Sequence, residues 1–166
     1  ACGGMRKGLW AWGGLRKQSD KEGRIGKEGG SKPLISMLSD GSATAVGQEN
    51  AAGALCSLAS NADNQVSIAK EGGIKPLISM LSDGSATAVG KENAAVALWN
   101  LAGNADNQVS IAKEGGIKPL IGMLSDGSAT ADGKENAAAA LISRALNADN
   151  QGSIAKEGGI KPLIRK

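Results

Sequence analysis

Aromatic residues and histidine are scarce in this chain of 166 residues, which contains three tryptophans and no phenylalanine, tyrosine or histidine. Without histidine, the chain lacks the side chain that most often serves as a general base or metal ligand near neutral pH. Its two cysteines, Cys2 and Cys56, provide neither a disulfide framework nor the spacing of a metal site. We therefore predict a protein that is not an enzyme and that needs no metal or cofactor.

The net charge is also small, and long hydrophobic runs are absent. The formal net charge is only +3, which is too small to predict nucleic-acid binding. No run of 18 apolar residues occurs, so we expect no direct insertion into a membrane. The scarcity of cysteine favours a reducing, intracellular compartment, although the sequence does not identify which one.

What the chain does contain is a unit of 43 residues that is repeated in succession. The sequence Lys-Pro-Leu-Ile begins at Lys32, Lys75, Lys118 and Lys161, always 43 residues apart. Residues 30–72 differ from residues 73–115 at six positions, and residues 73–115 differ from residues 116–158 at eight. Near-identical copies in tandem predict a repeat architecture rather than a globular domain with one central core.

Four positions change in both comparisons, and we call them the variable stripe. Their spacing of i, i+3, i+4 and i+7 places them on one face of a helix. A chain that keeps its scaffold and varies one helical face is typical of a binding protein. The stripe consists of Gly53, Cys56, Ser57 and Ser60 in the first copy, Val96, Trp99, Asn100 and Gly103 in the second, and Ala139, Ile142, Ser143 and Leu146 in the third.

Start and stop signals divide each unit into three helices. In residues 104–147, Asn104 is a good N-cap and the double glycine at 115–116 is a strong stop, so a short first helix is predicted over 107–114. A proline suits the first turn of the second helix, and a Ser-Asp-Gly turn ends that helix. The second and third helices of this copy are predicted from 117 to about 125 and from about 130 to 146.

The third helix has one side for packing and another for variation. In the middle copy, Ala94, Leu98 and Leu101 share one side of the helix. The variable stripe centres on the opposite side, since each residue turns the helix by about 100°. We therefore predict that the first side packs and that the variable stripe is exposed.

The period of 43 predicts a single repeat array over residues 1–166. Because neither end of the chain resembles a polar cap, we expect a fragment of a longer array, with any targeting segment outside this chain. The predicted division is a degenerate third helix over 1–17, full repeats over 18–60, 61–103 and 104–147, and a partial repeat over 148–166.

The motifs Gly-Gly-Ile-Lys-Pro-Leu-Ile and Glu-Asn-Ala-Ala-Val-Ala-Leu-Trp-Asn-Leu-Ala, in units of three helices, resemble those of armadillo repeats. The likeness covers nearly the whole chain, whereas HEAT repeats usually have two helices per unit. The resemblance implies an all-α, right-handed α-solenoid of armadillo-type three-helix repeats with a period of 43. It also implies that the third helices line a concave groove that binds extended peptides or partner proteins.

The resemblance further implies which positions contact a ligand. In peptide-binding members of the family, each third helix carries a Trp and, four residues later, an Asn that holds the ligand backbone. The Trp position holds Trp10, Gly53, Val96 and Ala139 here, and the Asn position holds Gly14, Ser57, Asn100 and Ser143. The predicted partner-binding residues of the concave face are Trp99, Asn100, Val96, Gly103, Cys56, Ser57, Ser60, Ile142, Ser143, Leu146 and Trp10.

Our leading hypothesis is a non-catalytic scaffold for protein–protein interaction, whose partner is a protein or an extended peptide. The alternative is a structural subunit that is permanently bound in a large complex, such as a membrane-associated, ciliary or cytoskeletal assembly. A folded monomer that binds peptides reversibly would support the first hypothesis, and a chain that is soluble only with other subunits would support the second. A consensus-designed repeat is a third class, and the irregular glycines argue against it.

Several single residues have two interpretations each. Trp99 either anchors a partner or covers neighbouring third helices, and Asn100 bonds either a ligand backbone or only water. Trp10 and Trp12 either cap the end of the array or meet a partner. Arg144, on the packing side of its helix, either marks a rotated helix or extends its charged end to solvent. The variable stripe itself is either selected for binding or free to drift after duplication.

Overall fold

The computed structural model describes residues 28–145 and 155–158 of the chain. Within these ranges the chain consists of helices and turns, and no strand occurs in them. The helices are α2 (Ser31–Ser39), α3 (Ala45–Leu58), α4 (Ala62–Lys70), α5 (Ile74–Ser82), α6 (Ala88–Leu101), α7 (Ala105–Lys113), α8 (Ile117–Ser125) and α9 (Ala131–Ala145). Two complete triplets, α4–α6 and α7–α9, therefore follow the pair α2 and α3.

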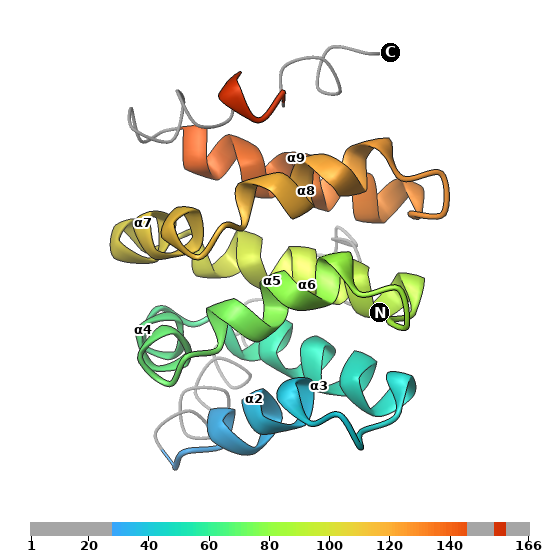
Figure 1. The fold of residues 1–166 in the computed structure, drawn as a ribbon. Helices are drawn as coiled ribbons and strands as arrows, with labels where there is room; N and C mark the ends of the chain where they lie inside the picture. Colours follow the sequence, from blue (N-terminus) through green and yellow to red (C-terminus); the bar gives the residue numbers. More distant parts are fainter. Residues whose placement is uncertain (1–27, 146–154, 159–166) are drawn as a thin grey trace, which may run out of the picture.

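Successive units stack on one another, so that equivalent helices form rows (Figure 1). The third helices α3, α6 and α9 form one row, in which each helix packs extensively against the next. The second helices α2, α5 and α8 form another row in front of them, and the short first helices α4 and α7 lie to one side. Each unit therefore buries its apolar surface against its neighbours, as in a solenoid.

Polar side chains set where the first helices begin. The side-chain oxygen of Asn104 accepts hydrogen bonds from the backbone N–H groups of Asp106 and Asn107. These bonds satisfy donors that would otherwise lack partners at the helix start. Because this cap acts on the residues directly after it, α7 begins at Ala105, earlier than the predicted start at 107.

The double glycine ends each first helix by two separate effects. Gly72 adopts a φ of +79°, which favours glycine, and its N–H donates to the carbonyl of Ala69. The N–H of Gly73 donates to the carbonyl of Ile68 at 2.9 Å, which completes a Schellman motif. A Cβ atom on Gly73 would lie 2.7 Å from Cγ2 of Ile68 and 3.1 Å from Cδ1 of Ile35. The first glycine is therefore needed for its backbone conformation and the second for close packing.

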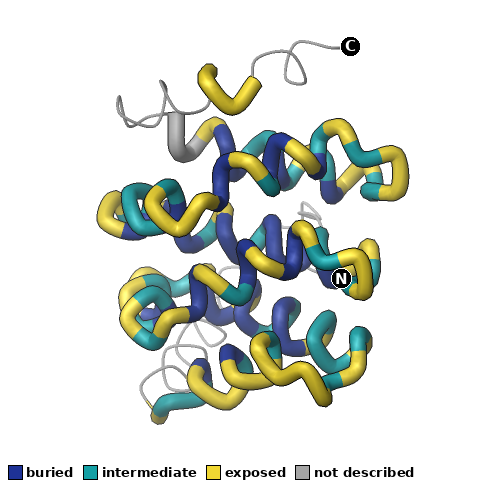
Figure 2. Tube along the Cα trace, in the orientation of Figure 1, coloured by how far each residue is buried: buried dark blue, intermediate teal, exposed yellow. Residues whose placement is uncertain are grey.

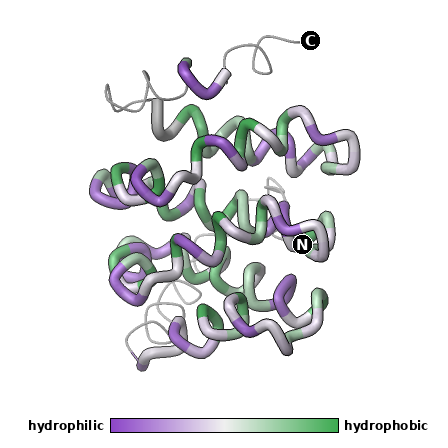
Figure 3. The backbone as a smooth tube through the Cα atoms, in the orientation of Figure 1, coloured by the Kyte–Doolittle hydropathy of each residue, from purple (hydrophilic) through white to green (hydrophobic). Residues whose placement is uncertain are grey.

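The hydrophobic core extends along the stack instead of forming one centre. Buried segments lie on the inner sides of the rows, and exposed segments lie on the outer sides of the helices and in the connecting loops (Figure 2). The hydrophobic segments lie mainly on the inner sides (Figure 3). The predicted packing residues Ala94, Leu98 and Leu101 are all 0% exposed. Burying a leucine side chain fully contributes about 1.5–3 kcal/mol, so these repeated apolar positions provide much of the stability of each seam between units.

Hydrogen bonds between units add polar links to this core. The Thr87 hydroxyl donates to Oε2 of Glu49 at 2.6 Å, across 38 residues of sequence. The Thr130 hydroxyl makes the same bond to Glu92 at 2.9 Å. In addition, Nδ2 of Asn93 donates to the backbone carbonyl of Glu49 at 3.3 Å. In both seams, a threonine directly before one third helix thus donates to a glutamate on the third helix of the preceding unit.

Candidate functional site

The variable stripe follows the row of third helices α3, α6 and α9, so residues far apart in sequence share one surface (Figure 1). Most of the stripe is accessible in the described part of the chain. Ser57, Ser60, Trp99, Gly103 and Ile142 are exposed, and Gly53, Val96, Asn100 and Ala139 are half-buried. The structure therefore brings the predicted residues of the three copies onto adjacent helices, while their role in binding stays a prediction.

Cys56 departs from the exposure that we expected of the stripe, because its exposed fraction is only 2%. The next third helix, α6, lies against it, and the backbone carbonyl of Cys56 accepts a hydrogen bond from Asn100. The same position holds Trp99 and Ile142 in the following units, with exposed fractions of 38% and 61%. The position lies at the edge of the seam, where a small side chain is covered and a large one extends outward. The expectation that Cys56 lines the open surface was wrong.

Asn100 has a partner that neither sequence interpretation included. Its Nδ2 atom donates to the carbonyl of Cys56 on α3 at 3.1 Å, which ties two third helices together. A primary amide has a second N–H and an oxygen with two lone pairs. Asn100 can therefore support the stack and still offer hydrogen-bonding groups to a ligand.

Trp99 is the largest side chain of the stripe, and 38% of its surface is exposed. A tryptophan that is partly held by its own protein presents a rigid apolar surface with few rotamers to lose on binding. Such residues are common at the centres of protein interfaces. Trp99 is therefore the best candidate for an anchor among the described residues.

Two further apolar residues extend the accessible surface and were missed by the sequence reasoning. Val46 is 59% exposed and Val89 is 40% exposed, both near the starts of third helices. Each lies seven residues, or about two helical turns, before a stripe position, namely Gly53 and Val96. Comparing neighbouring copies did not find them, because this position is valine in both of the first two copies and changes only to Asp132 in the third.

Some predicted residues cannot be placed. Trp10, Trp12 and Leu146 lie outside the described residues. Ser143 and Arg144 belong to α9, but their side chains are outside the described part of the structure.

No cluster of three or more His, Cys, Asp or Glu side chains suited to a metal ion occurs within residues 28–145 and 155–158. In the same ranges, no helix has the length and apolar character needed to cross a bilayer.

Stacked triplets of helices with one accessible, variable helical face define an α-solenoid repeat protein. Residues 61–103 match the family described as Armadillo/beta-catenin-like repeat, and the following copy, residues 104–146, differs from them at seven positions. The predicted fold class, an all-α solenoid of armadillo-type three-helix repeats, is confirmed. The matched range has the limits of the middle predicted repeat, and the division of the rest of the chain stays a prediction.

Solved structures with this fold include several engineered proteins. An engineered protein is 26% identical with a TM-score of 0.79, over 87% of this chain and 57% of that one. A computationally designed armadillo repeat protein for modular peptide recognition is 26% identical with a TM-score of 0.79, over 90% of this chain and 64% of that one. A designed armadillo repeat protein in complex with the peptide (KR)4 is 23% identical with a TM-score of 0.78, again over 90% and 64%. This chain thus spans less than two thirds of the length of each, and a comparison with curated protein sequences finds no match.

Proposed function

We propose that this protein is a non-catalytic scaffold that binds a partner protein or an extended peptide along the row of third helices. One observation carries the proposal: most of the large apolar side chains that are exposed in the described residues lie on these helices. They are Val46, Val89, Trp99 and Ile142. Apolar groups repeated on adjacent helices can receive successive side chains of an extended ligand, since an extended chain also presents its side chains at regular intervals.

The comparisons support the same proposal. Armadillo repeats form scaffolds that are typically not enzymes, and a protein with this fold was designed for modular peptide recognition. The surface of this chain differs in its chemistry from one suited to a charged peptide, because the exposed anchors are apolar and the neighbouring stripe residues are uncharged. We therefore propose a ligand with spaced apolar side chains.

Substituting Trp99 tests this proposal. The complete chain is used to select ligands from a displayed library of random peptides, and the dissociation constant of a selected peptide is measured by calorimetry. We expect Trp99→Ala to weaken binding at least about tenfold, because a central aromatic anchor contributes about 1.4 kcal/mol or more. Selected peptides should be enriched in apolar residues.

Val66→Ala is the matched control, since Val66 is also an exposed apolar residue, 36% exposed, but lies on α4 outside the row of third helices. This variant should bind like the original chain. If the two variants lost equal amounts of peptide affinity, this result would contradict the proposed binding surface. A chain that selects no peptide and is soluble only with other subunits would instead favour the structural-subunit hypothesis.

A further inference from the structure

Four aspartates of this chain are followed directly by glycine, namely Asp40, Asp83, Asp126 and Asp132. In such a pair, the backbone nitrogen of the glycine can attack the side-chain carboxyl carbon of the aspartate, because glycine has no side chain that shields its nitrogen. The reaction also needs a glycine N–H that is free of other hydrogen bonds and a backbone that is not locked in a helix. The fold provides these conditions for three of the four pairs.

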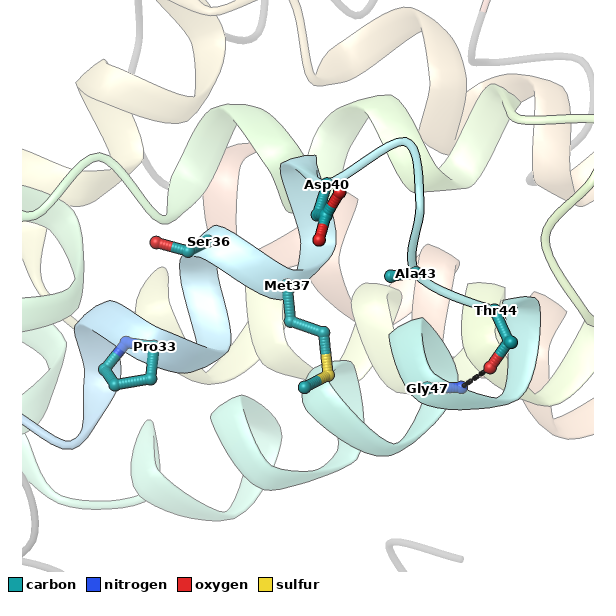
Figure 4. A pocket seen from close by; sticks show the side chains of 7 residues that line it. All are labelled: Pro33, Ser36, Met37, Asp40, Ala43, Thr44 and Gly47. Carbon is teal, nitrogen blue, oxygen red and sulfur yellow. Dashed lines mark hydrogen bonds between the residues drawn. The ribbon is translucent and has the colours of Figure 1, made fainter.

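The first three pairs lie in the turns that join second helices to third helices. Figure 4 shows the first of these turns, in which Asp40 follows α2 and Ala43 lies shortly before α3. In the next turn, the N–H of Ala86 donates to the carbonyl of Asp83 at 3.3 Å, while the N–H of Gly84 makes no hydrogen bond with any described residue. The glycines of all three turns are exposed, namely Gly41, Gly84 and Gly127. Their nitrogens are therefore accessible.

The side-chain carboxyl group of Asp83 is held close to the nitrogen of Gly84. Its Oδ1 atom accepts a hydrogen bond from the N–H of Ser85 at 2.8 Å. The ring that this bond closes contains both Cγ of Asp83 and the nitrogen of Gly84, as in other Asx turns. Glycine is not required here by the backbone or by packing, because the φ of Gly84 is not positive and a Cβ atom on it would meet no atom within 4 Å.

Asp132 and Gly133 are the same pair of residues in a different setting. They lie in the first turn of α9, where the N–H of Gly133 donates to the hydroxyl oxygen of Thr130 at 2.9 Å. Gly133 is buried, and a Cβ atom on it would lie 2.7 Å from Cε of Met123. Its nitrogen is thus engaged in a helix cap and covered by the neighbouring helix, so attack on Asp132 requires the start of α9 to unfold.

We propose that Asp83 and its equivalents Asp40 and Asp126 are sites at which the folded chain isomerises to isoaspartate, whereas Asp132 is protected. The nitrogen of Gly84 attacks Cγ of Asp83, an N–Cγ bond forms, and one carboxyl oxygen leaves as water with the carboxyl proton and the N–H proton. Water then adds to the resulting succinimide ring and opens it. Opening at the Cγ carbonyl restores aspartate. Opening at the former main-chain carbonyl leaves the chain connected through the side chain, which is isoaspartate.

Isomerisation changes the connection between a second and a third helix. It adds Cβ of the aspartate to the main chain of the turn and leaves the former main-chain carboxyl group free. The hydroxyl and the N–H of Ser85 favour the charged form of Asp83 and lower its pKa, whereas the attacked group is the neutral acid. These bonds therefore slow the reaction without preventing it, and we expect isoaspartate to accumulate gradually in long-lived protein.

The test incubates the complete chain at neutral pH and physiological temperature and samples it over several weeks. Isoaspartate is quantified with an isoaspartate-specific carboxyl methyltransferase and located by electron-transfer fragmentation of the tryptic peptides 28–70, 71–91 and 114–134. We expect isoaspartate to form at Asp40, Asp83 and Asp126 at least several times faster than at Asp132. In a sample unfolded by urea, this difference should disappear, because the cap and the packing that protect Asp132 are lost.

Gly84→Ala is the matched variant, since the position has room for a Cβ atom and the fold should be kept, as checked by circular dichroism. It should slow isomerisation at Asp83 several-fold, because the added methyl group shields the nitrogen, and leave the rates at Asp40 and Asp126 unchanged. Equal rates at Asp83 and Asp132 in the folded chain would overturn the proposal. So would an unchanged rate at Asp83 in Gly84→Ala, or a folded chain without isoaspartate at Asp83 after the unfolded sample has accumulated it.

Discussion

Asn107 joins three helices through one side-chain amide. The residue is 4% exposed, and its Nδ2 atom donates to the carbonyls of Leu101 and Gln65, both at 3.1 Å. Gln65 belongs to the preceding unit, so one buried residue both closes its own triplet and fixes the next seam. Buried polar groups are costly unless they are paired, so this side chain helps to specify a single register of stacking.

We predict that Asn107→Ala lowers the free energy of unfolding by about 1–3 kcal/mol, since it removes the donor from two carbonyl acceptors in a covered site. Chemical denaturation followed by circular dichroism measures the change. Ser110→Ala is the control in the same helix, because the Ser110 hydroxyl donates only within α7, to the carbonyl of Asp106. We expect this control to stay within about 0.5 kcal/mol of the original chain. If Ser110→Ala lowered the free energy of unfolding as much as Asn107→Ala, the hydrogen bond between units would contribute no more to stability than a bond within one helix.

At the scale of an element, the turn after each second helix is stabilised by an aspartate. Oδ1 of Asp83 accepts hydrogen bonds from the hydroxyl of Ser85 at 2.7 Å and from its N–H at 2.8 Å. Asp40 and Asp126 form the same turn with Ser42 and Ser128. These bonds favour the charged carboxylate and hold the pKa of Asp83 below its usual value of 3.8, with the Ser85 hydroxyl as the largest cause.

Because the pKa of Asp83 is lower in the folded chain than in the unfolded one, its carboxylate stabilises the fold above pH 3.8. This contribution is lost as the pH falls through the folded pKa. We predict that Ser85→Ala raises the pKa of Asp83 towards 3.8, as measured by an NMR titration of the side-chain carboxyl group. Ser79→Ala, a substitution at an exposed residue of α5, should leave the pKa of Asp83 unchanged. An unchanged pKa in Ser85→Ala would show that the hydroxyl does not set it.

At the scale of the whole molecule, stability depends on neighbours and not on a common centre. In a solenoid, each unit gains stability from its own helices and from its contacts with adjacent units. Helix α6 packs against both α3 and α9, and its residues Ala94, Ala95, Ala97, Leu98 and Leu101 are 0% exposed. Helix α2 has only two buried residues, Ser31 and Ile35. The centre of the described stack should therefore open less often than its first helix.

Amide hydrogen exchange measures this difference. We predict that the amides of α6 exchange more slowly than those of α2, because opening α6 breaks two seams at once. Leu98→Ala, which removes a fully buried side chain from α6, should reduce the protection of α6 more than Val89→Ala, which changes a residue that is 40% exposed in the same helix. Protection of α2 equal to that of α6 would mean that the described units unfold together.

The sequence by itself determined the helices and their order, because the signals for them are local. The cap at Asn104, the double glycine at 115–116 and the apolar spacing around Leu98 each act within a few residues of the chain. The period of 43 then implied stacking, since no single unit can bury its apolar side alone. The same local periodicity indicated which face of the third helix is accessible, and Trp99 follows it.

Only the tertiary structure decided which residues meet across a seam. The burial of Cys56, the bond from Asn100 to its carbonyl and the pairing of Thr87 with Glu49 depend on how far one helix lies from the next and at what register. The distance and the register between helices are set by the packing of many side chains from two units. They cannot be predicted from the periodicity within one unit. For the same reason, the equivalent residues Met37 and Met80 differ in exposure. The side chain of Met37, at one end of the described stack, is exposed, and that of Met80, within the stack, is buried.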